Sequence, residues 1–257
     1  TSTIVGHPNA EGTITVGAVR FDKNPTYSPE TYSVPEIMTF SSLGGTPVNG
    51  VVRLKPDITA PNGTNTNVDL GNGDWHDEVG SVVDPDTQFP NFFGTSAASP
   101  HAAAKAALIM EAWAKYEQGN PLTPEIIRSI QQNTAIDMET PGHDFVSGYG
   151  FIQAHDAIMY FANPIPSAEF IRLLTEDVEP GTTQDPITFE LIGDHFTDET
   201  LVLFRGEALD TSMIEFVDEN TILVKDLSFL GNPDFQAFTN SISSSGLDGG
   251  TTDPIYF

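Results

Sequence analysis

The sequence predicts an α/β domain followed by an all-β sandwich, on two observations. Up to about residue 162, short apolar strand patterns alternate with helix patterns, as in α/β layer folds. Beyond residue 170 only short runs of alternating apolar and polar residues follow, without a helix pattern. Two prolines within residues 162–170 (ANPIPSAEF) separate the mixed strand and helix pattern from the pattern of strands alone, so we expect domains at 1–162 and 163–257.

The first domain opens with strand patterns and then a long helix pattern. Residues 13–19 (TITVGAV) are short, apolar and β-branched, which is typical of a buried parallel strand. A second strand begins at Lys55 and passes into a loop rich in Pro, Gly and Asn. Residues 96–116 have a helical pattern whose small apolar face we expect to pack on a sheet, with Lys105 and Lys115 on the opposite face. That expected inward face consists of Ala103, Ala107, Met110 and Ala114.

Two shorter helices are expected after the long one. Thr123 is a typical N-cap, Pro124 suits the first helical position, and an acidic residue follows, so a helix is predicted to about residue 133. Its inward side chains are expected to be Ile126, Ile127 and Ile130. A last helix is predicted over residues 154–161.

Composition excludes several functions. The chain has 257 residues, 36 acidic against 10 basic residues and a formal net charge of −26, so nucleic acid and anionic membranes would be repelled. There is no cysteine, which excludes disulfides and thiolate metal sites. No run approaches the roughly 18 apolar residues of a membrane span. High acidity is also the ordinary composition of a soluble protein in salty or calcium-containing surroundings.

A serine stands where the long helix begins, in the stretch 94–101 (GTSAASPH). Gly94 permits backbone geometry that other residues resist, and small residues keep bulk away from Ser96. We expect Pro100 within the first turn, where a missing N–H has no consequence. The N–H of Ser96 would then be free at the helix N-terminus, where an anion is favoured. Acyl transfer needs such a donor for its oxyanion beside an exposed nucleophilic hydroxyl. The alternative is a serine that only caps the helix.

This stretch resembles the serine motif of the subtilisin-like serine proteases, GTS-x-x-x-P-H. Gly94, Thr95, Ser96, Pro100 and His101 all match, and TITVGAV, TFSSLGG, KPDITAPNG and SGYGFIQAHDAI resemble flanking segments of the family. The resemblance covers residues 1 to about 162. It implies part of a doubly wound parallel sheet with helices on both faces, a nucleophilic Ser96 whose own N–H serves the oxyanion hole, a structural His101, and a protein or peptide substrate.

The other catalytic residues of that family precede the serine in the chain. Neither an Asp-(Ser/Thr)-Gly nor a His-Gly-Thr pattern is present. We therefore expect this chain to be the second half of such a domain, inactive alone, with the Asp, the His and the oxyanion Asn supplied by an N-terminal half as partner. Without it, the strand at 13–19 would have an unpaired side. A substitute base is the alternative: His76 beside Asp77 is the candidate, whereas His7 lacks the context of the base motif.

Two ligand sites are weaker hypotheses. The segment 69–78 (DLGNGDWHDE) places oxygen ligands on a Gly-rich loop, which suits calcium, although the EF-hand spacing is absent and a solvated acidic loop is the alternative. Its ligands would be Asp69, Asn72, Asp74, Asp77 and Glu78. No other cofactor is expected. Glu11 lies in VGHPNAEG, which resembles the segment closing the family's primary specificity pocket, where its carboxylate would favour basic side chains.

The sequence of the second domain shows no signature of a nucleophile, an acid–base pair or a metal cluster. Its stretch GDHFTDETLVLFRGEAL resembles immunoglobulin-like IPT/TIG domains, with a hairpin turn expected at Asp218-Glu219-Asn220. A spacer or binding module is therefore expected. Taken together, the sequence predicts a secreted or cell-surface multidomain serine endopeptidase of the subtilisin type (peptidase S8). The alternative is a non-catalytic pseudo-protease or a surface-binding, adhesive protein that retains the scaffold.

Overall fold

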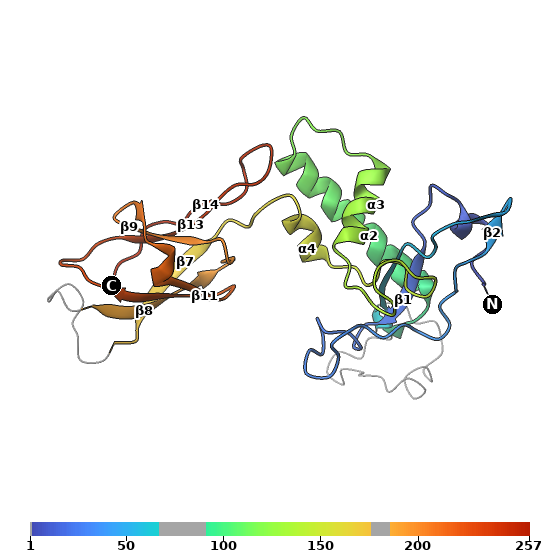
Figure 1. The fold of residues 1–257 in the computed structure, drawn as a ribbon, viewed down its shortest axis with the longest axis horizontal. Helices are drawn as coiled ribbons and strands as arrows, with labels where there is room; N and C mark the ends of the chain where they lie inside the picture. The colour runs from blue at the N-terminus through green and yellow to red at the C-terminus, as the bar shows by residue number, and fades with distance from the viewer. Residues whose placement is uncertain (1, 67–90, 176–185) are drawn as a thin grey trace. The chain divides into compact units, whose positions relative to one another are not determined.

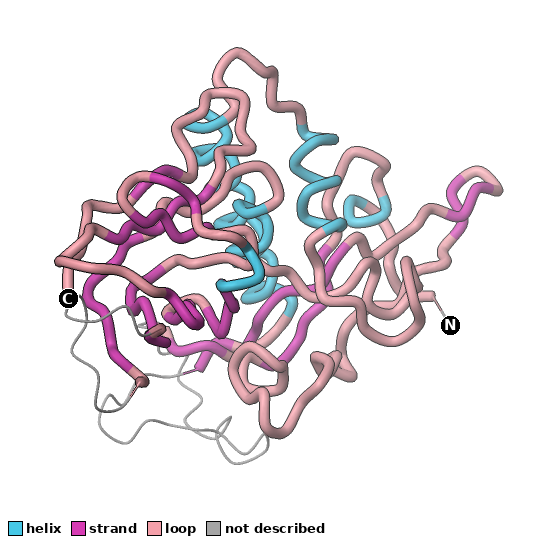
Figure 2. The backbone as a smooth tube through the Cα atoms, turned by 60° about the vertical axis from the view of Figure 1, so that its left-hand side comes forward, coloured by secondary structure: helices cyan, strands magenta, loops and turns pink. Residues whose placement is uncertain are grey.

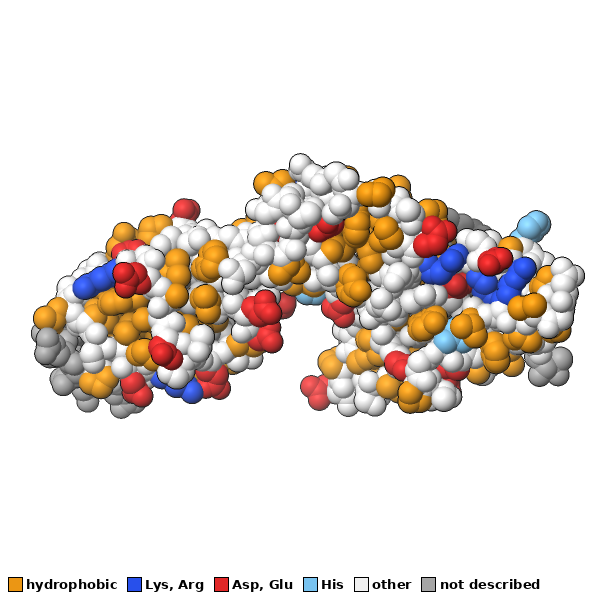
Figure 3. Space-filling model, turned by 45° about the horizontal axis from the view of Figure 1, so that its top comes forward, with side chains coloured by type: hydrophobic (Ala, Val, Ile, Leu, Met, Phe, Trp, Pro, Cys, Tyr) orange, Lys and Arg blue, Asp and Glu red, His pale blue; other side chains and the backbone are white. Residues whose placement is uncertain are grey.

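The computed structural model describes residues 2–66, 91–175 and 186–257. The chain divides into two compact units (Figure 1). The first contains Thr1–Glu111 and Pro121–Tyr160, and the second contains Ala112–Asn120 and Phe161–Phe257. Over the described ranges, no helix is both long and apolar enough to cross a membrane. Acidic side chains occur on both units rather than in one patch on the face shown in Figure 3.

The first unit is built on a pair of parallel strands, β1 (Val16–Arg20) and β4 (Ile58–Asn62), as the sequence predicts. Both strands are buried because they lie under α2 and consist largely of small and β-branched residues. Among the described residues, β1 has no paired strand other than β4, and one isolated bridge lies on its other side. Ile37 bridges to Val19 on one side of the pair, and Phe151 bridges to Thr59 on the other. The remaining strands of this unit are β2 (Pro47–Val48), β3 (Val51–Val52), β5 (Thr64–Asn65) and β6 (Asn91–Phe92).

Helix α2 (Thr95–Tyr116) packs on this pair, but not through the face that the sequence predicts. Its buried residues include Ala98, Ala102, Lys105 and Ile109. The predicted face is exposed, with Met110 55% exposed. The buried face and the predicted face have the same i, i+4, i+7, i+11 spacing in this alanine-rich helix. Because Lys105 belongs to the buried face, the sequence favoured the other face, which has no charged residue. Lys105 is nevertheless 2% exposed, and its Nζ donates to Oγ1 of Thr134 at 3.3 Å.

The shorter helices follow the sequence prediction closely. Helix α3 (Pro124–Asn133) begins with Pro124 and is capped by Thr123, whose Oγ1 accepts from the N–H of Ile126 at 3.3 Å. Its Ile130 is buried, whereas Ile126 and Ile127 are half-buried. Helix α4 (Ala154–Met159) ends sooner than predicted. A short 3-10 helix, η1 (His7–Asn9), precedes β1.

Over its described residues, the second unit contains two antiparallel four-stranded sheets, with strand orders β11-β12-β8-β7 and β10-β9-β13-β14. Figure 2 shows the strands in magenta. Both contribute to one apolar core, where the rings of Phe189 and Phe235 lie 5.1 Å apart. These sheets are consistent with a β domain after the α/β part, and the hairpin turn between Asp218 and Thr221 is confirmed. Its immunoglobulin-like character stays a prediction. The elements are β7 (Ser167–Leu173), β8 (Ile187–Asp194), β9 (Leu201–Phe204), β10 (Glu207–Ala208), η2 (Thr211–Met213), β11 (Ile214–Asp218), β12 (Thr221–Leu227), β13 (Phe235–Thr239) and β14 (Gly250–Thr251).

Candidate active site

The serine singled out by the sequence lies at the start of α2. Gly94 precedes the helix with φ +117°, a conformation that L side chains rarely adopt, and this allows the abrupt change from β6 into α2. Asn62, which is fully buried at the end of β4, fixes the junction. Its Oδ1 accepts from the N–H of Gly94 at 3.3 Å, and its Nδ2 donates to the carbonyl of Val19 at 2.8 Å. The junction is therefore tied to the ends of both parallel strands.

Ser96 is exposed, and its polar groups have no partner among the described residues. The N–H groups of Ala97 and Ala98 bond to the carbonyl of Gly94 at 2.9 and 3.2 Å, so the first turn is closed behind the serine. The N–H of Ser96 remains available at the helix N-terminus, where the aligned peptide dipoles favour a negative charge. An exposed hydroxyl thus stands beside a free donor at a positive helix end.

Pro100 does not lie in the first turn, contrary to the sequence prediction. The helix begins at Thr95, which makes Pro100 its sixth residue, and the carbonyl of Ser96 therefore lacks the N–H partner that a helix would provide. Two side chains bond backward around this position. Oγ of Ser99 donates to the carbonyl of Thr95 at 2.9 Å, and Nδ1 of His101 lies 2.8 Å from the carbonyl of Ala97. These contacts agree with a structural role for His101.

A pocket of about 370 Å³ adjoins the start of the helix, since Thr95 and Ser99 on either side of Ser96 both line it. Hydroxyl and aliphatic side chains dominate the lining, and His7 is the one ionisable group among the described lining residues. Glu11 is exposed and does not line this pocket. The described lining residues are Thr3, Ile4, Val5, His7, Pro8, Thr13, Ile14, Thr15, Val16, Ser42, Pro56, Thr95 and Ser99.

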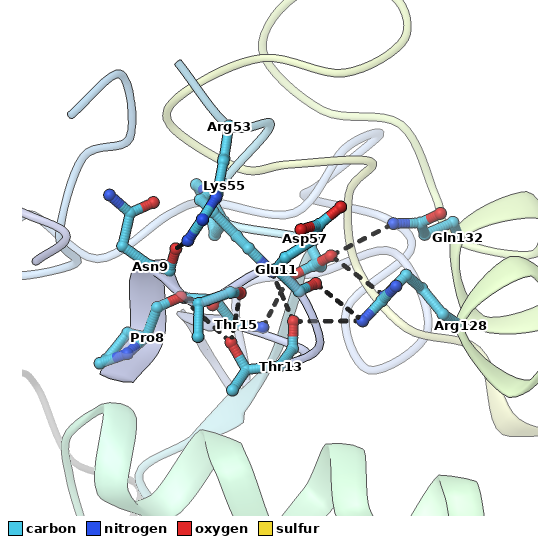
Figure 4. A network of polar contacts seen from close by, with 12 residues as sticks. Pro8, Asn9, Glu11, Thr13, Thr15, Arg53, Lys55, Asp57, Arg128 and Gln132 are labelled. Atoms are coloured by element: carbon cyan, nitrogen blue, oxygen red, sulfur yellow. Dashed lines mark hydrogen bonds and ion pairs between the residues drawn. The ribbon is translucent and has the colours of Figure 1, made fainter. Parts of the chain in front are cut away.

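A buried ionic network lies behind one wall of this pocket (Figure 4). Lys55 and Asp57 are 3% and 4% exposed, and their Nζ and Oδ2 atoms are 2.6 Å apart. Arg128, on α3, places its Nε 3.6 Å from Oδ1 of Asp57. The sequence analysis did not single out these residues. A lysine and an aspartate stand directly before the apolar strand pattern at 58–62. Because charged side chains are rarely buried unless they are paired, this pattern could have indicated a buried ion pair.

The other residues proposed from the sequence lie elsewhere. His76 and the calcium candidates at 69–78 fall outside the described residues. In the part of the chain that the structure describes, no group of three or more metal-ligating side chains is present. His101 lines a second pocket, of about 440 Å³, together with Phe21, Tyr27 and Phe151.

The subtilase family (peptidase S8) matches residues 1–150, more than half of the chain. The chain therefore belongs to the subtilase family, as its serine motif indicates. No curated protein matches it.

Two solved structures are similar to the chain. A lanthipeptide protease has 20% sequence identity and a TM-score of 0.40, with 60% of this chain and 43% of that one covered. Fervidolysin from Fervidobacterium pennivorans, a keratinolytic enzyme related to subtilisin, has 14% identity and a TM-score of 0.39, with 97% and 53% covered. The chain thus spans about half the length of these proteins.

Proposed function

We propose that this chain is part of a serine endopeptidase in which Ser96 is the nucleophile. The observation that carries the proposal is the exposed Ser96 with a free N–H at the N-terminus of the 22-residue helix α2. Family membership supports the same assignment. Gly94, Thr95 and Pro100 shape the junction, and His101 braces the second helical turn.

The reaction that this arrangement serves is acyl transfer from a peptide. Oγ of Ser96 bonds to the carbonyl carbon while its proton passes to a general base. The N–H of Ser96 donates to the oxyanion that forms. The C–N bond then breaks, the amine leaves with the proton, and water hydrolyses the acyl ester to regenerate the serine. No histidine among the described residues is hydrogen-bonded to Ser96, so we assign the base, its orienting carboxylate and the second oxyanion donor to a further part of the peptidase domain.

The substrate is proposed to be a protein or peptide that presents an uncharged side chain to the pocket beside Ser96. Hydroxyl and aliphatic groups line that pocket, and a buried charge without a partner would be strongly disfavoured there. A preference for basic side chains would need Glu11 at the site. The protein is proposed to act outside the cell, with the second unit as a spacer or binding module; family membership is the support for the location.

The test is Ser96→Ala in the complete peptidase, assayed by peptide hydrolysis and by labelling with a fluorophosphonate probe. We expect both to be lost. Ser129→Ala is the matched control, because Ser129 is exposed on α3 and its hydroxyl accepts only from Asn133. If Ser96→Ala is still labelled or hydrolyses peptides at the parent rate, Ser96 is not the nucleophile. A complete protein that is inactive with Ser96 intact would favour the pseudo-protease alternative.

A further inference from the structure

We propose that Lys55, Asp57 and Arg128 form a positioning unit that sets the shape of the pocket beside Ser96 and so its selectivity for substrate side chains. This inference rests on the proposed function, because the pocket has a substrate only if Ser96 acts on one. The three residues do not line the pocket, and so they are not catalytic residues. They act through the segment 7–16, which supplies one wall.

That wall is a single stretch of chain backed by the network. Six lining residues belong to the segment 7–16. Pro56, between the two charged residues of the buried pair, is itself a lining residue. Asp57 accepts from the N–H of Thr15 through Oδ2 at 2.7 Å, and Lys55 donates to the carbonyl of Thr13. The buried pair is thus bonded to the backbone of two residues that face the pocket.

Arg128 joins the same wall to helix α3. Its Nη2 donates to the carbonyls of Glu11 and Thr13 at 3.3 and 3.4 Å, and Nε of the same guanidinium faces Asp57. Nε2 of Gln132, one turn further along the helix, donates to Oδ1 of Asp57 at 3.5 Å. Figure 4 shows these groups converging from the chain just before β4, from α3 and from the segment 7–16.

The charge balance explains why wall and network depend on each other. Two cations, Lys55 and Arg128, share one buried carboxylate, so the carbonyl oxygens of the wall must complete the set of partners for the positive groups. Hydrogen bonds to charged groups are stronger than neutral ones, and an incompletely paired buried charge is strongly destabilising. The wall therefore keeps the one conformation in which its carbonyls face the two cations. Losing a cation frees the wall without removing any atom from the pocket.

The first arm of the test measures the wall directly, by hydrogen exchange on the 257-residue chain. Arg128 is chosen because its side chain is 22% exposed, so its loss leaves no deep cavity. In Arg128→Gln we expect exchange at the amides of residues 9–15 to rise about tenfold, which corresponds to one charge-assisted hydrogen bond. Arg128→Lys should restore part of the protection. The matched control is Arg172→Gln, which removes the exposed ion pair with Glu190 in the second unit. Unchanged exchange at 9–15 in Arg128→Gln overturns the proposal.

The second arm measures selectivity in the complete peptidase. For peptides that present a large apolar side chain to the pocket, Arg128→Gln should raise KM about tenfold while the rate of Ser96 labelling by a small fluorophosphonate stays within about twofold. A parallel fall in labelling would show a general structural role and overturn the proposal, as would freer exchange with unchanged KM. If peptide hydrolysis proves independent of Ser96, the proposed function fails. The hydrogen-exchange result at residues 9–15 in Arg128→Gln is separate from that outcome: an increase supports the positioning of the wall by the network, and no change contradicts it.

Discussion

Lys105 is buried on the face of α2 that packs against the first unit's core, where an ammonium group has little to offset its lost hydration. Burial lowers its pKa from the ordinary 10.5 to about 8, and Asp156 only partly opposes this shift. Below about pH 8 the lysine is charged in both the folded and the unfolded chain, and folding must bury the charge. Between about pH 8 and 10.5 the unfolded chain binds more protons, so the free energy of unfolding rises with pH.

We therefore predict that Lys105→Met stabilises the first unit at pH 7, by up to about 3 kcal/mol, since each pKa unit corresponds to about 1.4 kcal/mol. The gain should shrink as the pH approaches 10.5, where the wild-type lysine folds neutral. Denaturant unfolding at pH 7 and pH 10 measures both effects. Lys115→Met, at an exposed position of the same helix, is the control. Equal effects of the two substitutions would contradict the argument.

At the scale of elements, the loop between β13 and β14 is organised by one carboxylate. Asp248 is 2% exposed and accepts from the N–H groups of Asn163 and Ile242 at 2.8 and 3.0 Å and from the hydroxyls of Ser241 and Ser243. Burial alone would raise the pKa of Asp248, but these hydrogen bonds hold it well below its ordinary value. The carboxylate therefore stabilises the second unit above pH 4 or so, and this stability is lost as the pH falls.

Asp248→Asn is expected to destabilise the second unit by about 2 kcal/mol at pH 7, because the amide cannot replace a charged acceptor of several donors. The difference from wild type should diminish as the pH falls below about 4, where the wild-type carboxylate loses its advantage. Thermal unfolding of both proteins between pH 7 and pH 2 measures this difference in stability. Asp253→Asn removes an exposed carboxylate from the same unit as the control. A difference that is constant with pH would refute the role given to the charge.

The calcium hypothesis also concerns one element, the segment 69–78. If Asp69, Asn72, Asp74, Asp77 and Glu78 hold the ion, calcium at a hundredfold its Kd stabilises the protein by about 2.7 kcal/mol. Melting is compared after chelation and after adding calcium, with magnesium as the control ion and Asp74→Asn as the variant expected to abolish the shift. An unchanged melting temperature would leave the solvated acidic loop as the better account.

Elements with a local signal were predictable from the sequence, and long-range contacts were not. The Thr123-Pro124 start of α3 and the parallel strands carry their own patterns of capping and branching. The buried face of α2 was missed because two stripes of the helix satisfy one periodicity, and only the partners of Lys105 decide between them. The Asp57 network was missed for a related reason: Arg128 follows Asp57 by 71 positions, and no local pattern links them.

For the whole molecule, the formal charge of −26 sets the class of partner. Electrostatic repulsion between this negative charge and other anions opposes binding to phosphate backbones and anionic lipids. The basic residues are few, and Lys55 and Arg128 are engaged internally with Asp57. The pocket beside Ser96, whose described lining consists mainly of hydroxyl and aliphatic side chains, is the surface that we propose for substrate recognition.

The last prediction concerns the 257-residue chain by itself. Ser96 has a donor for the oxyanion but, within the described ranges, no hydrogen-bonded imidazole to take its proton. Dismantling a catalytic triad lowers kcat by about a millionfold, so the isolated chain should hydrolyse a peptide anilide at about that fraction of an intact subtilase's rate. Ser96→Ala should then lower the rate little further, whereas in the complete peptidase it should abolish activity. Hydrolysis by the isolated chain at the rate of an intact subtilase would mean that His76 or another group of this chain serves as the base.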